Sequence, residues 1–109
     1  MFPSHDRNIF IILENEIPIG QVRFESNQSS EAEISIYLLP GKSGRGVGVP
    51  VIQRACRLIL MESNILKIIA NIRFDNVKSI SAFTKSGFSH ESGSEINNDH
   101  IKMIFKKVN

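Results

Sequence analysis

The chain has 109 residues, of which 41% are hydrophobic and 22% are charged, and its net charge at neutral pH is +2. These values are typical of one globular domain, residues 1–109, and exclude a strongly basic nucleic-acid-binding protein. One cysteine excludes a disulfide framework, and the three histidines lack metal-site spacing. The chain lacks a membrane-length hydrophobic run and a signal-peptide pattern, so we expect a cytoplasmic protein without metal, nucleic-acid or membrane partners.

Three strands are expected in the first part of the chain. Residues 8–13 are almost all apolar, which favours a strand covered on both faces. The polar segment 14–16 indicates a hairpin, and residues 19–25 and 32–39 alternate between apolar and polar side chains, as half-buried strands do. Together these segments predict an antiparallel meander.

A glycine-rich loop, residues 40–48, separates this meander from a helix predicted over residues 49–63. Apolar residues recur along that segment at helical spacing, and Cys56 among them is expected to pack in the core rather than act as a nucleophile. Pro50 is tolerated only in the first turn of a helix, because its missing N–H would have no partner there. The helix must therefore begin at the glycine loop.

The rest of the chain predicts a strand, a second helix and a final pair of strands. Residues 67–73 alternate as a strand does, and Asn76 is a favourable N-cap for a helix over residues 77–86. The last strands are predicted at residues 88–91 and 100–107. The predicted order is β-β-β-α-β-α-β-β.

The glycine-rich loop is a candidate anion site. Gly44, Gly46 and Gly48 alternate directly before the helix, with Arg45 between the first two. Glycine lets the backbone approach a bulky anion, and the free N–H groups at a helix N-terminus attract phosphates. A plain turn followed by a helix cap would have the same sequence.

Two common nucleotide-binding motifs do not fit this loop. A dinucleotide-binding fingerprint needs an acidic residue about 20 residues after its glycines, and residues 66–70 contain none. The tripeptide 41–43, Gly-Lys-Ser, has the ending of a P-loop, but a P-loop needs a glycine five residues earlier, where this chain has Ile36.

A third kind of site fits both the loop and the segments around it. Residues 32–40, residues 44–48 and the following helix resemble the acetyl-CoA-binding region of the GNAT superfamily of N-acetyltransferases. Gly46 and Gly48 match the glycines of that family's signature, Gln/Arg-x-x-Gly-x-Gly/Ala. Residues 76–88 are similar to a second family segment, which begins with Asn-x-x-Ser/Ala and ends with Lys-x-Gly-Phe. The resemblance covers nearly the whole chain.

The resemblance implies both a fold and an activity. The fold is α+β (α/β three-layer), with a mixed, mostly antiparallel sheet that lacks the family's first strand and helices. The activity is direct transfer of an acetyl group from acetyl-CoA, the co-substrate, to a primary amine of a small molecule. Residues 19–24 are most similar to acetyltransferases found with nonulosonic (pseudaminic-type) sugar biosynthesis, so an amino sugar or a similar amine is the expected acceptor.

Residues at the family's motif positions are expected to form the site. In the family the third strand seen here splays from the next one and pairs with the pantetheine arm, and the loop amides hold the pyrophosphate. Glu33 aligns with a carboxylate that acts as general base in some members, although an ordinary strand-face glutamate fits the same pattern. Ser79 is the other catalytic candidate. The expected cofactor-binding residues are Tyr37, Leu38, Leu39, Lys42, Ser43, Gly44, Arg45, Gly46, Val47, Gly48, Val49, Asn76, Ser79 and Phe83.

The chain departs from the family pattern at two positions. Ser43 stands where the signature has Gln or Arg, so weaker cofactor binding is expected unless Lys42 replaces the charge. Phe83 stands where many members have a tyrosine that protonates the leaving thiolate, and phenylalanine has no proton to donate. Ser79 or water would then fill that role, and Phe83 is expected on the core face of its helix.

Three functions remain open from the sequence. The first is an acetyltransferase, the second a CoA-binding or interaction module without activity, and the third a dimerisation domain with an empty loop. Because the chain starts at what resembles the family's second strand, residues 8–13 are expected to have an unpaired edge. That edge predicts a homodimer, or assembly with a separate front segment.

Overall fold

The computed structural model describes residues 6–26, 30–42, 46–90 and 99–107. The predicted elements are all present in the predicted order, with small differences at their ends. The strands form one sheet in the order β1-β2-β3-β4-β6-β5, in which β3 and β4 are parallel and the other neighbours antiparallel. The prediction of a mixed, mostly antiparallel sheet is therefore confirmed. The elements are β1 (Asp6–Glu14), β2 (Ile17–Ser26), β3 (Glu31–Leu38), α1 (Gly48–Glu62), β4 (Lys67–Arg73), α2 (Val77–Lys85), β5 (Ser89–His90) and β6 (His100–Lys106).

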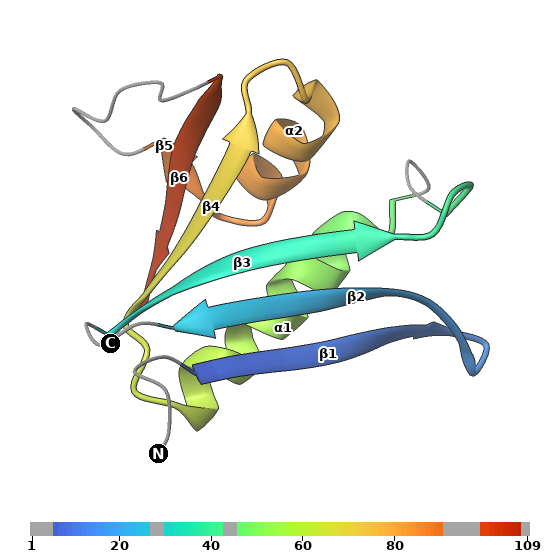
Figure 1. The fold of residues 1–109 in the computed structure, drawn as a ribbon, viewed down its shortest axis with the longest axis horizontal. Helices are drawn as coiled ribbons and strands as arrows, with labels where there is room; N and C mark the ends of the chain where they lie inside the picture. Colours follow the sequence, from blue (N-terminus) through green and yellow to red (C-terminus); the bar gives the residue numbers. More distant parts are fainter. Residues whose placement is uncertain (1–5, 27–29, 43–45, 91–98, 108–109) are drawn as a thin grey trace.

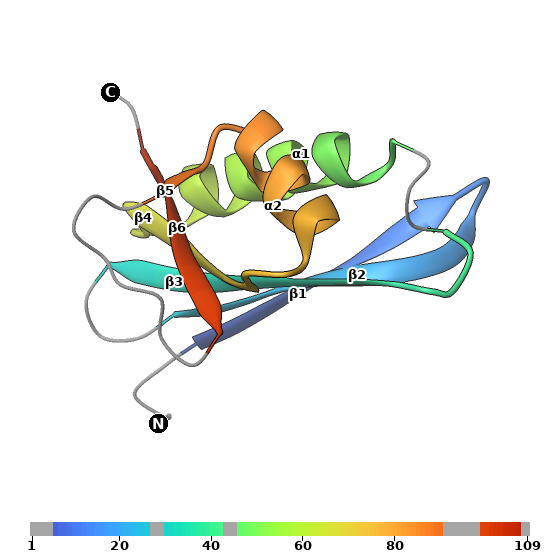
Figure 2. The same cartoon turned by 90° about the horizontal axis from the view of Figure 1, so that it is seen from above.

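Both helices cover the same face of the sheet, and the described residues leave the opposite face open (Figures 1 and 2). Alternation along the strands explains this arrangement. In β2, Val22 and Phe24 are 1% exposed beneath the helices, whereas Arg23 between them faces the open side. The described part of the chain thus has two layers, a sheet and the helices on one of its faces, rather than the three layers that the resemblance implied. Neither helix described here has the length and hydropathy needed to cross a membrane.

Local sequence signals explain where the two helices begin and where α2 ends. α1 starts at the glycine loop, so Pro50 lies in its first turn as predicted. Asn76 caps α2, because its Oδ1 accepts a hydrogen bond from the N–H of Ser79 at 3.2 Å. Gly87, with φ +111°, ends α2 in the left-handed region, and its N–H donates to the carbonyl of Thr84 at 3.1 Å.

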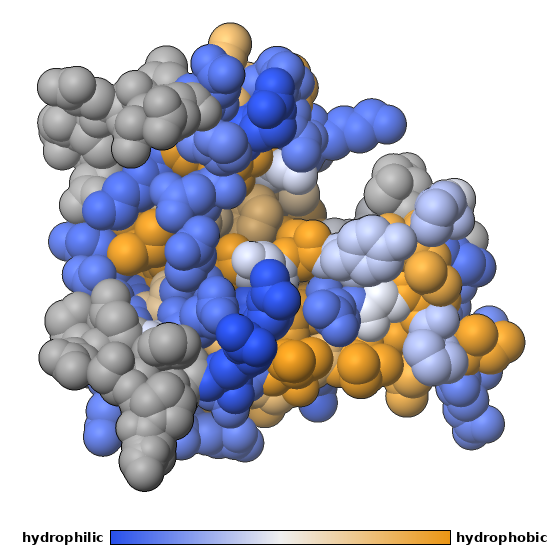
Figure 3. All heavy atoms as spheres, in the orientation of Figure 1, coloured by the Kyte–Doolittle hydropathy of each residue, from blue (hydrophilic) through white to orange (hydrophobic). Residues whose placement is uncertain are grey.

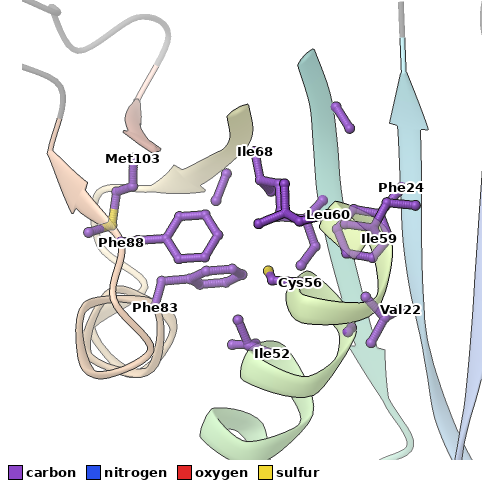
Figure 4. Close-up of a cluster of buried hydrophobic side chains, with 14 of the residues drawn as sticks. Val22, Phe24, Ile52, Cys56, Ile59, Leu60, Ile68, Phe83, Phe88 and Met103 are labelled. Carbon is purple, nitrogen blue, oxygen red and sulfur yellow. The ribbon is translucent and has the colours of Figure 1, made fainter. Parts of the chain in front are cut away.

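The hydrophobic core lies between α1, α2 and the covered face of the sheet (Figure 4). Phe83 of α2 packs edge-on against Phe88, with ring centroids 5.0 Å apart, and both residues are less than 5% exposed. Cys56 lies on the buried face of α1, and its burial raises the pKa of the thiol to about 12. A thiol held neutral in this way is a poor nucleophile, which supports the predicted packing role.

A tight turn joins the antiparallel strands β1 and β2 in a hairpin. Asn15 and Glu16 form its turn with φ of 51° and 69°, the backbone twist that suits tight hairpins. Gly20 pairs with Leu38 of β3 so closely that an added Cβ would lie 2.2 Å from the carbonyl oxygen of Tyr37. Only glycine fits at this close approach of the two strands.

Candidate functional site

A V-shaped opening in the sheet lies between β3 and β4 (Figure 1). These strands pair only at their beginnings, where residues 31–33 lie beside residues 67–69. Beyond Glu33, β3 continues to pair with β2 on its other edge, but among the described residues it has no strand partner on the β4 side. The backbone of residues 34–38 therefore offers hydrogen-bonding groups to an extended ligand.

The first groove is a cavity of about 640 Å³ between the far half of β3, the start of α1 and one side of α2. Its volume is in the range of small-molecule sites. Figure 3 shows a notch between the two lobes of the molecule, with hydrophobic residues at its base. The lining residues are Ile36, Leu38, Gly46, Gly48, Val49, Ile52, Val77, Lys78, Ser79, Ser81, Ala82, Phe83 and Lys85.

One end of the first groove has the properties of an anion site. The first N–H groups of α1 have no partner within the helix, and no acidic residue occupies its first turn. Gly46 reaches this point with φ +77°, a conformation that favours glycine. Gly48 begins the helix, and a Cβ there would lie 3.8 Å from Ala82 of α2, in ordinary contact. The two glycines thus serve differently, since only Gly46 is required by the backbone conformation.

The second groove is a cavity of about 260 Å³ that follows the V-shaped opening itself. It shares Ile36, Ser79 and Phe83 with the first groove, so the two grooves meet at these side chains. A ligand in one groove would therefore meet a ligand in the other beside Ser79. The lining residues are Ile34, Ser35, Ile36, Ala70, Asn71, Ile72, Arg73, Asn76, Ser79, Phe83 and His100.

Phe83 and Ser79 of α2 both line the place where the grooves meet, and they differ in whether they can donate a hydrogen bond. Phe83 is 4% exposed and packs in the core, as expected from the sequence, and it is also a lining residue of both grooves. It offers no hydrogen-bond donor. Ser79 is half-buried and presents a hydroxyl, which both donates and accepts hydrogen bonds. Ser79 is thus the nearest proton-carrying side chain to Phe83 along this face of the helix.

Glu33 lies at the point where β3 and β4 separate. Its Oε2 accepts a hydrogen bond from Nδ2 of Asn71 at 3.1 Å. The Glu33 side chain is exposed on the open face and does not line either groove, whereas Asn71 lines the second. Any proton transfer between the second groove and Glu33 would need a water molecule between them.

The other predicted residues are distributed unevenly around the grooves. Tyr37 is 56% exposed on the open face, and Val47 packs against the core. The N–H of Leu39 donates to Ile19 at 2.8 Å and its carbonyl accepts from Lys42 at 3.0 Å, so both groups are already engaged. The Nζ of Lys42 is 3.3 Å from a carboxylate oxygen of Glu14, which directs its charge toward the β1–β2 hairpin. Ser43, Gly44 and Arg45 lie outside the described residues.

Several groove residues were missed by the sequence analysis. Lys78 and Lys85 of α2 add positive charge to the first groove. Asn71, Arg73 and His100 reach the second groove from β4 and β6, and no local pattern marks them. Arg73 and Asp75 form an exposed ion pair at 3.2 Å, whose hydrogen bond lowers the pKa of Asp75. No cluster of three or more His, Cys, Asp and Glu side chains in the described ranges is placed to bind a metal ion.

Comparison with known families gives a match over most of the chain. A family model described as "Acetyltransferase (GNAT) domain" matches residues 2–89. No curated protein matches the chain.

Solved structures share the fold at low sequence identity. PaiA N-acetyltransferase from Thermoplasma acidophilum, in complex with coenzyme A, is 19% identical with a TM-score of 0.77 over 94% of this chain and 62% of its own. A spermidine N-acetyltransferase SpeG chimera from Vibrio cholerae and hSSAT is 22% identical, with a TM-score of 0.78 over 94% of this chain and 67% of its own. N-acetyltransferase PseH from Campylobacter jejuni is 17% identical, with a TM-score of 0.78 over 94% and 69%. The chain thus spans about two thirds of the length of these proteins.

Proposed function

The chain belongs to the GNAT family of acetyltransferases, and we propose that it transfers the acetyl group of acetyl-CoA to a primary amine of a small molecule. The observation that carries this proposal is the meeting of two grooves at Ile36, Ser79 and Phe83. Direct transfer needs two ligands whose reacting atoms touch, and positioning supplies much of the acceleration in such a reaction. The single-domain boundary 1–109 and the cytoplasmic location remain predictions.

The first groove fits acetyl-CoA. Its β3 wall, including Leu38, leaves backbone groups free for an extended chain with amides, and its α1 end offers the free N–H groups next to Gly46. Lys78 and Lys85 add charge that suits phosphate groups. Tyr37, Leu39, Lys42 and the undescribed part of the glycine loop stay predicted contacts.

The reaction requires proton movement that this chain's side chains must support. An N–C bond forms as the C–S bond breaks, the amine loses a proton and the thiolate gains one. Ser79 lies where the grooves meet and is the proposed donor toward the thiolate. Glu33 is the proposed acceptor through water, held by its hydrogen bond from Asn71.

A second candidate function is a CoA-binding module without transferase activity. Phe83 favours it, because its ring brings no acid to the meeting point of the grooves. Both functions require acetyl-CoA binding, and only the first releases free thiol when an amine is present.

We also propose that the chain assembles as a homodimer or with a separate segment along β1. Within the described residues β1 is an edge strand that pairs only with β2. Ile9, Ile11 and Leu13 lie on its open face and are 51%, 56% and 60% exposed. A long apolar edge of this kind invites pairing with another chain.

Two measurements test the proposed activity. At 100 times its Kd, acetyl-CoA should stabilise the fold by about 2.7 kcal/mol, which raises the Tm by about 10 °C. Release of CoA thiol with a panel of primary amines then separates the enzyme from the binding module. An unchanged Tm at millimolar acetyl-CoA would refute both functions, and binding without thiol release from any amine would support the second.

A further inference from the structure

The second groove lacks the chemistry that a polycation needs. None of its described lining residues is acidic, and its polar members offer amide, hydroxyl, imidazole and guanidinium groups. An ammonium group taken out of water needs carboxylates or several acceptors around it. The groove is therefore a poor site for a polyamine.

Arg23 lies on the neighbouring strand, beside a residue that lines this groove. It lies directly opposite Ser35 in the β2–β3 register, and Ser35 lines the groove. Side chains at such opposed positions lie on the same face with their Cβ atoms about 5 Å apart. The guanidinium of Arg23 is therefore within a side chain's reach of the groove on the open face.

One nitrogen of the Arg23 guanidinium, Nε, lacks an acceptor among the described residues. This atom is buried and has no hydrogen-bond partner in the part of the chain that the structure describes. A buried donor in this state is costly, because it has lost water and gained nothing in exchange. An oxyanion in the groove would satisfy it, and the fork of Nε and a terminal nitrogen matches a carboxylate or a phosphate.

Other charged side chains around the groove already have partners. Arg73 pairs with Asp75 at 3.2 Å, and Glu33 accepts a hydrogen bond from Asn71 at 3.1 Å. The Nε of Arg23 differs from them in having no hydrogen-bond partner within the described ranges. An incoming oxyanion would supply the acceptor that this nitrogen lacks.

We propose that the second groove takes an amine whose molecule also carries an oxyanion, a carboxylate or a phosphate. The oxyanion binds Arg23 next to Ser35, and the amine points along the groove toward Ser79, where the first groove begins. The assignment rests on the proposed acetyl transfer, for which it names the acceptor class. It excludes polyamines as preferred acceptors.

Binding in the absence of acetyl-CoA tests the assignment with the complete chain. Isothermal titration calorimetry measures the Kd of two pairs of amines, glucosamine 6-phosphate with glucosamine and β-alanine with β-alaninamide. The Kd of spermidine is measured for comparison with these four compounds. We expect one oxyanion-bearing amine of these pairs to bind about 10- to 100-fold more tightly than its partner without the oxyanion, because hydrogen bonds to charged groups are strong. The pair that shows the difference identifies phosphate or carboxylate.

Variants assign the effect to Arg23. Arg23→Gln should remove the preference, Arg23→Lys should keep part of it, and Arg57→Gln should leave it intact, since Arg57 is exposed on α1 across the sheet. If Arg23→Gln does not fold, Ser35→Asp places a carboxylate opposite Arg23 and should also abolish the preference.

Each outcome decides the question. Equal binding within both pairs, or tightest binding of spermidine, would overturn the proposal, as would a preference that survives in both Arg23→Gln and Ser35→Asp. A preference lost in these variants but kept in Arg57→Gln would support it. Failure of acetyl-CoA to raise the Tm would refute acetyl transfer and leave the Arg23 oxyanion site to be judged by calorimetry alone.

Discussion

Replacing Phe83 by tyrosine should add the general acid that this position lacks and should raise kcat. Phe83 lines both grooves where they meet, and the family resemblance implies an acid tyrosine at this position, so a hydroxyl on its ring would supply a proton donor at this meeting point. A general acid in place contributes about 10²- to 10⁴-fold to a rate. Because Ser79 or water already fills part of this role, we expect Phe83→Tyr to raise kcat by about 10-fold or more.

The same substitution at Phe88 is the matched control. Phe88 is 3% exposed, lies between the rings of Phe83 and Phe105 with centroids 5.0 and 5.4 Å away, and lines neither described groove. A hydroxyl buried there without a partner should cost about 1–3 kcal/mol and give no rate gain. Phe83→Tyr should cost less, because Phe83 lines both grooves whereas Phe88 lines neither.

Thiol release under saturating acetyl-CoA and amine measures kcat for the three proteins, and urea unfolding measures their stability. If Phe83→Tyr loses as much stability as Phe88→Tyr and leaves kcat unchanged, the position does not present a proton to the reaction. The position of Phe83 where the two grooves meet would then have no role in catalysis.

Three further predictions concern the fold and its assembly. Gly20→Ala should destabilise the protein by about 3 kcal/mol in urea unfolding, because its Cβ would lie 2.2 Å from a carbonyl oxygen of β3; Gly48→Ala, with its nearest contact at 3.8 Å, should cost little, and equal losses would contradict the reasoning. Burial raises the pKa of Cys56 from 9.0 to about 12, so folding favours the neutral thiol, and the stability that it adds is complete below pH 9 and is lost as pH rises toward 12. Between about pH 8 and about pH 10.5, the free energy of unfolding measured in urea should therefore fall less in the Cys56→Ala variant than in the parent protein. Equal decreases in the two proteins would count against this prediction. Ile11→Glu should convert a dimer to a monomer in light scattering, whereas Met61→Glu, an exposed apolar position on α1, should not; a strictly monomeric parent protein would contradict the proposed β1 interface.

Local patterns were sufficient for the elements of this fold. Pro50 and the spacing of buried residues placed the start of α1 at the glycine loop, and Asn76 placed the start of α2. These signals depend on neighbours within one helical turn or on adjacent strand positions, which a sequence displays directly. The family's motifs added the glycine loop and Ser79, which the structure places at the start of α1 and on the first groove.

Distances between elements depended on the tertiary structure alone. The sequence did not reveal that Glu33 lies on the open face behind Asn71, that Leu39 has its backbone groups engaged, or that Lys42 pairs with Glu14. Apart from the bond between Leu39 and Lys42, these contacts join residues far apart along the chain, so they follow from register and strand order rather than from local composition.

The sequence by itself determined the order of strands and helices, the buried face of most of them and the family to which the motifs belong. It was wrong about β1, which was expected to be covered on both faces, because Ile9, Ile11 and Leu13 are 51%, 56% and 60% exposed in the described part of the chain. The family resemblance implied that β3 splays from β4, and the tertiary structure decided that the two strands separate after three paired residues and that two grooves meet at Ser79. It also decided that Arg23 lies opposite Ser35, which lines the second groove. The physical reason is that side-chain periodicity is a local property, whereas the place where two strands diverge is set by packing of the whole sheet against both helices.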